Sequence, residues 1–551
     1  MSEETVPGKS LARRALSVFP WVFGFSLAAL PVFLGLLNHD VGWFLCAAES
    51  VLGGRKLYVE VMEINPPLIV WLNFVPVLTA RHLEISEILT FRILMLGLLA
   101  GSLLMSRWAL SRSHPDSPAT RRVILILAII AFLPLAGYDF GQREHLMLIL
   151  FFPYLLLASV RVKGSPLGLG MPCLVGLIAG VGISLKPHFV LLWIAIETYL
   201  AWTLRSARVW LRPEAIAVAM TGLAYGVAIL VFTPEYPSWL RWTMPVYAAC
   251  SRASFLSLMS EQATQFTMVA LLGFLALRPR EEHRRCCQLF LIANLILLGI
   301  AFLQDKGFSY HFYPPLATAL MLIGLLSLGS PGSSGRLPRC SALVMKCSLA
   351  MMVLNASAAQ VRESLHWRGC PGKSDTTHGR MIRLVRANAR SGSLYTFSPA
   401  VAASFPLVNY GQVRWEVGHP CLWFLPNLYP AGLQSAQSLA IRPLTGMGRT
   451  ERFLFEMVVS DLLRDRPTLL VVDVNEKMPA FNGRHFDYLA YYSLDPRFAE
   501  FLRDYEKLAD VDTFRVFRRK VPAIVTQGDR SGWFSLGDVI DHRGSKYDDR
   551  L

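Results

Sequence analysis

The chain has few charged residues for its length. Asp, Glu, Lys and Arg make up 17% of its 551 residues, whereas soluble globular proteins carry about 25%. Hydrophobic residues make up 53%, mean hydropathy is +0.40, and the apolar residues are clustered in long runs. This composition excludes an ordinary water-soluble protein and indicates a chain that folds in lipid.

Several catalytic and metal-binding motifs are also missing. No Walker phosphate loop, GxSxG, HExxH or EF-hand pattern stands in a supporting context. The nine cysteines include no CxxC pair, which argues against a zinc ribbon or a thioredoxin-type centre. In the C-terminal region, Cys370 and Cys421 could form a disulfide outside the cytoplasm, and two free thiols are the alternative. No cleavage site follows the first apolar run, so we expect it to remain as a membrane helix.

Eleven apolar segments are close to the roughly 20 residues that a helix needs to cross the hydrocarbon core. We therefore predict a polytopic α-helical membrane protein with about 11 transmembrane helices. The stretch 66–83 is also apolar, but it contains three prolines and would invert the sidedness of every later loop if it were a span. We interpret it as a helix at the outer interface. The eleven segments are 17–37, 91–109, 123–138, 145–160, 167–185, 188–203, 214–232, 264–277, 286–303, 312–329 and 341–358.

The loops between these segments alternate in charge. One set is rich in Arg and the other is poor in basic residues, which predicts a cytoplasmic N-terminus in a bacterial inner (plasma) membrane. Everything after residue 358 would then lie outside the cytoplasm. The net charge of +15 reflects this topology and does not indicate a nucleic-acid partner. The basic loops hold Arg13, Arg14, Arg107, Arg112, Arg121, Arg122, Arg161, Lys163, Arg205, Arg208, Arg212, Arg278, Arg280, Arg284, Arg285, Arg336 and Arg339.

The composition becomes that of a water-soluble domain after the last apolar segment. Strand-like runs alternate there with helix-like stretches, which predicts a soluble periplasmic α/β domain over 359–520. The predicted plan is completed by a cytoplasmic N-terminus (1–16), a membrane domain (17–358) with its first external loop at 38–90, and a disordered tail (521–551). The strand-like runs are 393–398, 468–474 and 513–518, and the helix-like stretches lie near 378–390, 451–464 and 484–507.

The predicted external loops carry polar residues where an apolar hairpin would be enough to turn the chain. Ionisable groups at the membrane edge are candidates for function. A solvated helix end or a snorkelling lysine is the alternative for any single one of them. The loops would converge if the helices form a bundle. The four clusters are Asn38-His39-Asp40, Tyr138 to His145, Lys186-Pro187-His188 and Gln304 to His311.

These residue types suit one kind of chemistry. A carboxylate surrounded by Arg, Lys and His fits transfer of a group from a phosphate leaving group. The carboxylate would accept the proton of an acceptor hydroxyl, and the cations would stabilise the departing phosphate. Because no nucleotide motif is present, the donor would have to be activated already, and a lipid-linked donor fits a membrane enzyme best.

The first external loop resembles a known family. Asp40 is followed by a Gly-Gly-x-x-Leu-Tyr turn (Gly53 to Tyr58) and by Glu63-x-x-Pro66-Pro67-Leu68. This order is similar to the C-superfamily of membrane glycosyltransferases, more narrowly to the protein mannosyltransferase and lipid A aminoarabinose transferase group, over about residues 15–320. The resemblance implies transfer of a sugar from a polyprenyl-phosphate donor to a glycan, lipid or protein acceptor on the outer face of the membrane.

The resemblance also implies roles for single residues. Asp40 matches the catalytic base of the family, and Asp139 matches an acidic residue that is often part of the site. Aminoarabinose transferases have Lys before the Pro-Pro pair, where this chain has Asn65, so other cations must bind the donor phosphate. No Asp-x-Asp motif follows Asp40, and we expect a reaction without metal or cofactor. The proposed phosphate ligands are Arg143, Lys186, Lys306 and His311, and further site candidates are Glu63, His145, His188 and Tyr310.

Two other classes of function stay open at this point. A transporter or flippase for a lipid-linked sugar would also need cations in a membrane cavity, but such proteins often have inverted repeats and broken helices at mid-depth. No internal repeat is evident in the sequence, and the polar clusters lie at helix ends on one side rather than at mid-depth. An inactive relative could instead serve as a scaffold in envelope assembly, because Asn65 departs from the family pattern. In the C-terminal domain, Trp415, Trp423 and Tyr429 could stack on a sugar or belong to the core.

Overall fold

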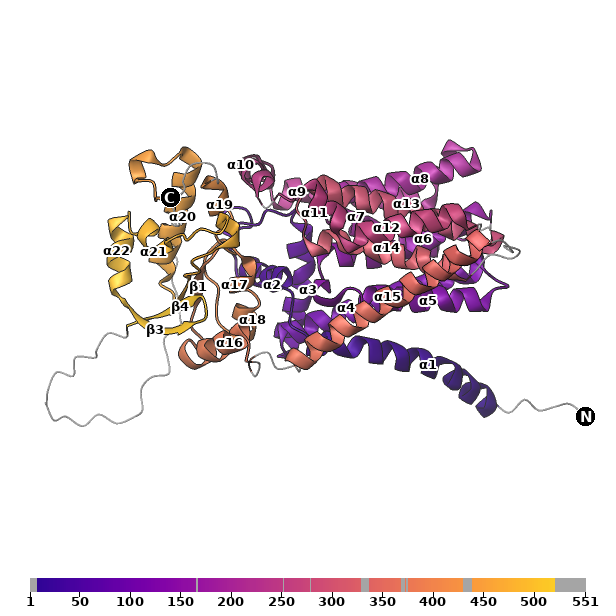
Figure 1. Ribbon diagram of the computed structural model, residues 1–551, viewed down its shortest axis with the longest axis horizontal. Coiled ribbons are helices and arrows are strands. Elements are labelled where there is room, and N and C mark those ends of the chain that lie inside the picture. The colour runs from indigo at the N-terminus through magenta and orange to yellow at the C-terminus, as the bar shows by residue number, and fades with distance from the viewer. Residues whose placement is uncertain are drawn as a thin grey trace, which may run out of the picture.

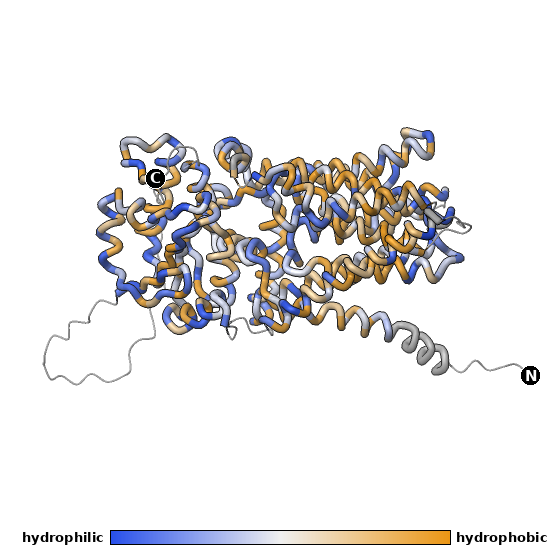
Figure 2. The backbone as a smooth tube through the Cα atoms, viewed as in Figure 1, coloured by the Kyte–Doolittle hydropathy of each residue, from blue (hydrophilic) through white to orange (hydrophobic). Residues whose placement is uncertain are grey.

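The computed structural model describes residues 7–164, 167–250, 252–277, 279–328, 336–367, 372, 375–429 and 439–520. Figure 1 shows a bundle of long helices on one side and a smaller domain that contains the β-sheet on the other. Hydrophobic residues predominate along the bundle, whereas hydrophilic residues are frequent in the C-terminal domain (Figure 2). The predicted class, a polytopic helical membrane protein with a C-terminal α/β domain, is confirmed.

Helices occupy all eleven segments that the sequence marks as apolar. Within the described part of the chain, six helices are long and apolar enough to cross a bilayer, or up to seven if a bent pair counts as one span. Two others, α7 and α12, are shorter apolar helices, so the predicted number of eleven spans is not confirmed. The eleven helices are α1 (Pro7–Leu34), α4 (Glu87–Ser113), α5 (Pro118–Phe132), α6 (Arg143–Val162), α7 (Gly170–Ser184), α8 (Val190–Leu204), α9 (Pro213–Phe232), α12 (Gln262–Ala276), α13 (Glu281–Gln304), α14 (Ser309–Ser327) and α15 (Arg336–Trp367).

The chain bends sharply where the first apolar helix ends. The segment Pro20–Leu34 of α1 and the next helix, α2 (His39–Leu52), meet at 77°. Asn38 caps α2, because its side-chain oxygen accepts a hydrogen bond from the backbone N–H of Asp40 at 2.9 Å, a group that has no partner within the helix. The stretch 66–83 forms the helix α3 (Leu68–Leu83), and Figure 1 places α2 and α3 between the bundle and the C-terminal domain.

Short elements complete the loops of the bundle and of the C-terminal domain. In the bundle they are η1 (Gly137–Asp139), η2 (Pro187–Phe189), η3 (Ala207–Leu211), α10 (Tyr236–Ala249) and α11 (Phe255–Ser260). In the C-terminal domain they are α17 (Val401–Ser404), α18 (Leu407–Gly411), α19 (Leu425–Leu428), η5 (Leu444–Gly446), η6 (Pro479–Phe481) and α21 (Tyr488–Tyr492).

The C-terminal domain is built on a four-stranded sheet with the strand order β1-β2-β4-β3. β1 (Leu394–Phe397) runs parallel to β2 (Leu469–Asp473). β4 (Phe514–Arg519) pairs antiparallel with both β2 and β3 (Tyr505–Val511). The longer helices of the domain are α16 (Thr377–Asn388), α20 (Arg449–Asp465) and α22 (Pro496–Arg503). The three predicted strand runs are confirmed as β1, β2 and β4.

The predicted helix-like stretch 484–507 is wrong at its C-terminal end. α22 ends at Arg503, and β3 begins at Tyr505. The charged pair Glu506-Lys507 suits a helix surface, but pairing with β4 decides the structure: Arg518 donates a hydrogen bond to Glu506 across the two strands at 3.0 Å. Such cross-strand ion pairs stabilise neighbouring strands.

Some predictions concern residues outside the described ranges. Cys370 and the tail 521–551 are among them, so the disulfide and the disorder of the tail stay predictions. Cys421 is buried, and its thiol donates a hydrogen bond to the carbonyl of Pro399 at 3.2 Å. Of the predicted N-terminal segment 1–16, the residues from Pro7 onward already belong to α1.

A buried ion cluster joins α6, α8 and α9 near the C-terminal end of α6. Glu214 of α9 accepts two hydrogen bonds from Arg161 of α6, both at 2.8 Å. Arg212 lies 3.3 Å from Glu214 and pairs with Glu197 of α8, which also accepts a hydrogen bond from the hydroxyl of Tyr154. Both carboxylates are almost completely buried, so each depends on these partners to offset its loss of hydration.

Replacing Glu214 by Ala should therefore destabilise the bundle. We expect Glu214→Ala to lower the free energy of unfolding by about 3–5 kcal/mol, because a buried cation loses its partner. In the control, Glu281→Ala, the lost pair with Arg284 (3.0 Å) involves a carboxylate that is 85% exposed, and such pairs contribute about 0–1 kcal/mol. Denaturant unfolding of the purified protein, followed by tryptophan fluorescence, measures the difference. Equal losses would show that the cluster does not hold the bundle together.

Candidate active site

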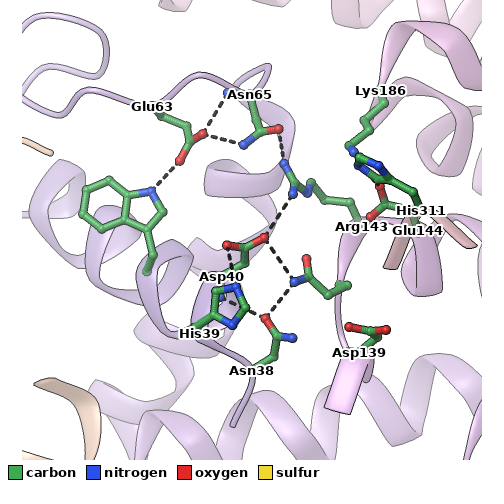
Figure 3. A network of polar contacts seen from close by, with 12 residues as sticks. Asn38, His39, Asp40, Glu63, Asn65, Asp139, Arg143, Glu144, Lys186 and His311 are labelled. Carbon is green, nitrogen blue, oxygen red and sulfur yellow. Dashed lines mark hydrogen bonds and ion pairs between the residues drawn. The ribbon is translucent and has the colours of Figure 1, made fainter. Parts of the chain in front are cut away.

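The four polar clusters of the external loops lie together at one end of the bundle (Figure 3). Asp40 is in the first turn of α2, and Arg143 is the first residue of α6. Lys186 directly precedes η2, and His311 is in the first turn of α14. Each predicted cluster therefore contributes to a single polar site, and most of its side chains come from the beginnings of helices.

Asp40 accepts hydrogen bonds on one carboxylate oxygen, and His39 lies near the other. Its Oδ2 accepts hydrogen bonds from Arg143 Nη2 at 3.2 Å and from Gln142 Nε2 at 3.1 Å. Gln142 Nε2 also donates to Asn38 Oδ1 at 2.7 Å, while His39 Nε2 lies 3.6 Å from Asp40 Oδ1. The Asp40 side chain is 15% exposed, against 3% for Arg143. A carboxylate that is fixed by hydrogen bonds and partly exposed suits the role of a general base.

A chain of hydrogen bonds fixes Arg143 from its other side. Arg143 Nη1 donates to Asn65 Oδ1, and the side-chain amide of Asn65 donates to Glu63 Oε1. Trp43 donates to Glu63 Oε2, and Trp239 donates to the carbonyl of Glu63 at 2.7 Å. Burial raises the pKa of Glu63 above its usual range. Position 65, where Asn replaces the Lys of the resembling family, is thus in direct contact with a cation from another helix.

A second ion pair lies next to Arg143. The Lys186 ammonium donates to Glu144 Oε1 and to Gln304 Oε1, the latter at 3.2 Å. Burial lowers the pKa of Lys186 to about 8. His311 Nε2 lies 3.9 Å from Glu144 Oε1, and neither ring nitrogen of this buried histidine has a hydrogen-bond partner among the described residues. Within the same part of the chain, Glu144 Oε2 and Arg143 Nε are also buried without partners. Such atoms are rare in folded proteins and identify this region as one where a polar ligand would find contacts.

Tyr310 connects the two centres. Its ring centroid lies 5.7 Å from the Arg143 guanidinium carbon and 5.4 Å from the Lys186 ammonium nitrogen. Cations are attracted to the face of an aromatic ring at this range. Two cations from different helices therefore lie around one side chain, close enough to act on one anionic group.

Three further candidates have local roles. Lys306 donates to the carbonyls of Tyr247 (2.9 Å), Ala248 (3.1 Å) and Cys250, at the end of α10. His145 accepts a hydrogen bond from the N–H of Gly141 and bonds the carbonyl of Phe132, both at 2.9 Å. His188 is half-buried, with its ring 4.8 Å from that of Phe189. The contacts of Lys306 and His145 hold loops in place rather than facing Asp40.

Asp139 lies beside the network without a hydrogen bond to Asp40 or Arg143. Its Oδ1 accepts a hydrogen bond from the Ser309 hydroxyl at 3.1 Å, which ties η1 to the start of α14. Burial raises the pKa of Asp139 to about 7. At neutral pH a substantial fraction of this carboxyl group is therefore protonated.

Some site residues were not predicted individually. Gln142 and Glu144 lie within the second cluster and Gln304 begins the fourth, but the sequence analysis singles out only their neighbours. Their position in the sequence could have indicated Gln142 and Glu144 as site residues, because they flank Arg143 at the start of a helix. Asn38 was quoted in its cluster, but its role as a cap that also receives Gln142 required the structure.

The three aromatic residues proposed as a sugar platform do not share one surface. Trp415 and Tyr429 are buried in the core of the C-terminal domain, as the alternative interpretation has it. Trp423 lines an apolar cavity of about 420 Å³, together with Trp239 and Trp242 of α10. This cavity lies next to Met62 and Ile64, on either side of Glu63.

Comparisons with known proteins support the fold. No protein-family model and no curated protein matches the sequence. The crystal structure of ArnT from Cupriavidus metallidurans bound to undecaprenyl phosphate matches with a TM-score of 0.50 at 13% identity, covering 90% of this chain and 98% of ArnT. Its apo state matches with a TM-score of 0.48 at 12% identity, covering 91% and 98%. The mycobacterial arabinofuranosyltransferase AftD has a TM-score of 0.42 at 14% identity, covering 92% of this chain and 40% of AftD.

The similarity to ArnT extends over nearly the whole of both chains, so it includes the helical bundle and the C-terminal domain together. The chain thus has the fold of ArnT, and the resemblance inferred from its first external loop is confirmed at the level of the fold.

The raised pKa of Asp139 predicts a pH-dependent contribution to stability. An ordinary Asp loses its proton near pH 3.8, whereas Asp139 keeps it to about pH 7 in the folded protein. Between these values the folded state binds the additional proton, so this group lowers stability as the pH rises through the window. We expect the midpoint of thermal unfolding to fall less between pH 5 and pH 7.5 in Asp139→Asn than in the wild type.

A matched control is Asp305→Asn, which alters an external aspartate paired with Arg252 at 2.8 Å. This variant should keep the pH dependence of the wild type. An unchanged slope in Asp139→Asn would show that Asp139 does not titrate in this range.

Proposed function

We propose that the protein is an inverting glycosyltransferase that moves a sugar from a polyprenyl-phosphate donor to a hydroxyl group of an envelope acceptor. The observation that carries this proposal is the contact between Asp40, whose side chain is partly exposed, and Arg143. Arg143 and Lys186 both lie over the ring of Tyr310. The fold supports it, because the ArnT structure with the same fold was solved with undecaprenyl phosphate bound.

In the proposed reaction, Asp40 accepts the proton of the acceptor hydroxyl while that oxygen attacks the anomeric carbon of the sugar. The bond between the anomeric carbon and the phosphate oxygen breaks, and the phosphate leaves on its lipid. Attack from the side opposite the phosphate inverts the anomeric centre. Arg143 and Lys186 stabilise the negative charge on the phosphate, and His311 is within reach of the same region. The expected independence from metal ions stays a prediction.

The charge of the loops supports a location for this reaction. The Arg-rich loops favour a cytoplasmic location for the opposite end of the bundle. We therefore propose a bacterial inner-membrane protein whose site and C-terminal domain face the periplasm. The acceptor, a glycan, lipid or protein, would reach Asp40 from that side.

A transporter or flippase for the same lipid-linked sugar is the alternative from another class. It would need its polar groups near the middle of the membrane. Asp40, Arg143 and Lys186 instead lie at or next to the beginnings of helices, at the end of the bundle beside the C-terminal domain. An inactive scaffold was the other alternative, because Asn65 replaces a lysine of the resembling family. The direct contact of Arg143 with Asn65 argues against it, since Arg143 supplies a cation at this position.

Asp40→Asn should abolish transfer, since it removes the general base but keeps the shape of the side chain. We expect kcat to fall about 100-fold or more, with unchanged expression and membrane insertion. Transfer is measured in membranes with polyprenyl-phosphate sugars, and lipid-linked sugars are compared between a deletion strain and the Asp40→Asn strain. A polyprenyl-phosphate sugar that accumulates in both identifies the donor. Asp504→Asn, which alters an exposed aspartate paired with Arg466 in the C-terminal domain, is the control, and full activity in Asp40→Asn would refute the assignment.

Arg143→Ala and Lys186→Ala should each weaken donor binding. A charge-assisted hydrogen bond contributes about 1.5–3 kcal/mol, so we expect the Kd for undecaprenyl phosphate to rise about tenfold or more. Because the pKa of Lys186 is about 8, wild-type affinity should fall from pH 7 to pH 9 as the ammonium loses its proton. Lys186→Ala should lack most of this decline.

The control for donor binding is Lys507→Ala, which removes a surface lysine that pairs with Asp510 at 2.6 Å in the C-terminal domain. Binding is measured on purified protein in lipid nanodiscs. If Arg143→Ala and Lys186→Ala both bind undecaprenyl phosphate as the wild type does, the phosphate site lies elsewhere.

A further inference from the structure

The bend between α1 and α2 is contacted by a residue from the far end of the chain. The hydroxyl of Tyr410, in α18 of the C-terminal domain, accepts hydrogen bonds from the backbone N–H of Leu37 at 3.1 Å and from Arg92 Nη2 at 3.2 Å. Leu37 immediately precedes Asn38, the cap of the helix that carries Asp40. One hydroxyl group therefore links the C-terminal domain to the segment that leads into the proposed catalytic base.

Arg92 holds the other side of the bend. This residue of α4 is buried, and it donates to the carbonyls of Phe33 at 3.2 Å and Gly35 at 2.7 Å. These carbonyls belong to the last turn of α1 and the residue after it, where no further helical N–H groups are available. The carboxylate of Glu363 faces the same turn, since a Cβ on Gly35 would lie 3.3 Å from its Oε1. A buried arginine within a candidate membrane span is costly and is expected to have a function.

The C-terminal domain also grips α2 beyond the bend. Asn409, next to Tyr410, donates to the carbonyl of Gly42 at 3.1 Å. The approach is so close that a Cβ on Gly42 would lie 2.6 Å from Asn409 Oδ1. The rings of Trp43 and Phe405 are 5.5 Å apart. The C-terminal domain therefore contacts the bend, the first turn of α2 and the residue after that turn.

We propose that Tyr410 is a positioning residue, through which the C-terminal domain and Arg92 together set the bend and so the place of Asp40 relative to Arg143. This inference rests on the proposed function of Asp40. The hydroxyl of Tyr410 satisfies the N–H of Leu37, and without it this N–H loses its partner. Arg92, Glu363 and the bonds of Asn38 to Gln142 and Tyr138 hold the neighbouring residues. Displacement of a catalytic group by about 1 Å can reduce the rate about 100-fold, so a small change in the bend has a large effect on transfer.

The test compares two Tyr→Phe variants of the full-length protein. Tyr410→Phe removes the hydroxyl at the bend. Tyr505→Phe removes a hydroxyl that donates to the carbonyl of Pro467 at 2.6 Å inside the C-terminal domain. We expect Tyr410→Phe to lower kcat at least tenfold, with the donor KM changed less than twofold. Amide hydrogen exchange of the peptide spanning residues 35–42 should accelerate in Tyr410→Phe, and Tyr505→Phe should change neither quantity.

Arg92→Lys provides a second variant in case Tyr410→Phe folds poorly. Lys keeps the charge but lacks the planar fork with which Arg92 reaches Phe33 through Nη1 and Gly35 and Tyr410 through Nη2. It should lower kcat and accelerate exchange in the same peptide. In the double variant the two effects should be strongly non-additive, because both residues act on one bend.

The outcomes separate the two proposals. If Tyr410→Phe and Tyr505→Phe have equal kcat and equal hydrogen exchange at residues 35–42, the positioning role of Tyr410 is overturned. The proposed function is untouched by that result as long as Asp40→Asn is inactive. A fully active Asp40→Asn would overturn the proposed function, and the exchange measurement would then still decide whether Tyr410 holds the bend.

Discussion

The guanidinium of Arg143 is the contact on which the proposed site depends. It bonds the carboxylate of Asp40 on one side and the amide of Asn65 on the other, so three separate chain segments meet at one buried cation. A buried guanidinium is tolerated only with such partners. Its planar fork can serve both at once, which the single ammonium group of a lysine cannot do in the same way. The arrangement fixes the orientation of Asp40 before any substrate enters.

The position of this cation explains how the chain manages without the lysine expected before Pro66-Pro67. The side chain at position 65 is neutral, and it accepts a hydrogen bond from a cation that the start of α6 supplies. Glu63 in turn fixes Asn65 through two hydrogen bonds to one oxygen. A positive charge therefore lies at position 65 although the side chain there is neutral. Lys186, paired with Glu144, completes the positive side of the site.

The sequence predicted the fold at the level of helices and strands because hydrophobic run length and loop charge are local properties. It also identified Asp40, Arg143, Lys186 and Tyr310, which are polar residues in short loops where nothing apolar is needed. It could not predict that Lys306 caps α10 or that His145 bonds two backbone groups, because those partners lie on segments whose approach is a tertiary property. The strand Tyr505–Val511 was missed since its charged residues suit either structure and only β4 decides between them. The sequence also did not indicate a role for Arg92, because its partners come from α1 and from α18 and meet it only in the folded chain.

The contact between Leu37 and Tyr410 joins positions 373 residues apart in the chain. During synthesis the bend that carries Asp40 leaves the ribosome first, and the domain that closes it leaves last. The bundle can thus be inserted into the membrane long before its reactive end is complete. A chain that stops after α15 would contain every predicted site residue and still lack the hydroxyl that secures the bend. The complete form of the proposed site therefore requires that the last domain has been synthesised and has folded onto the bundle.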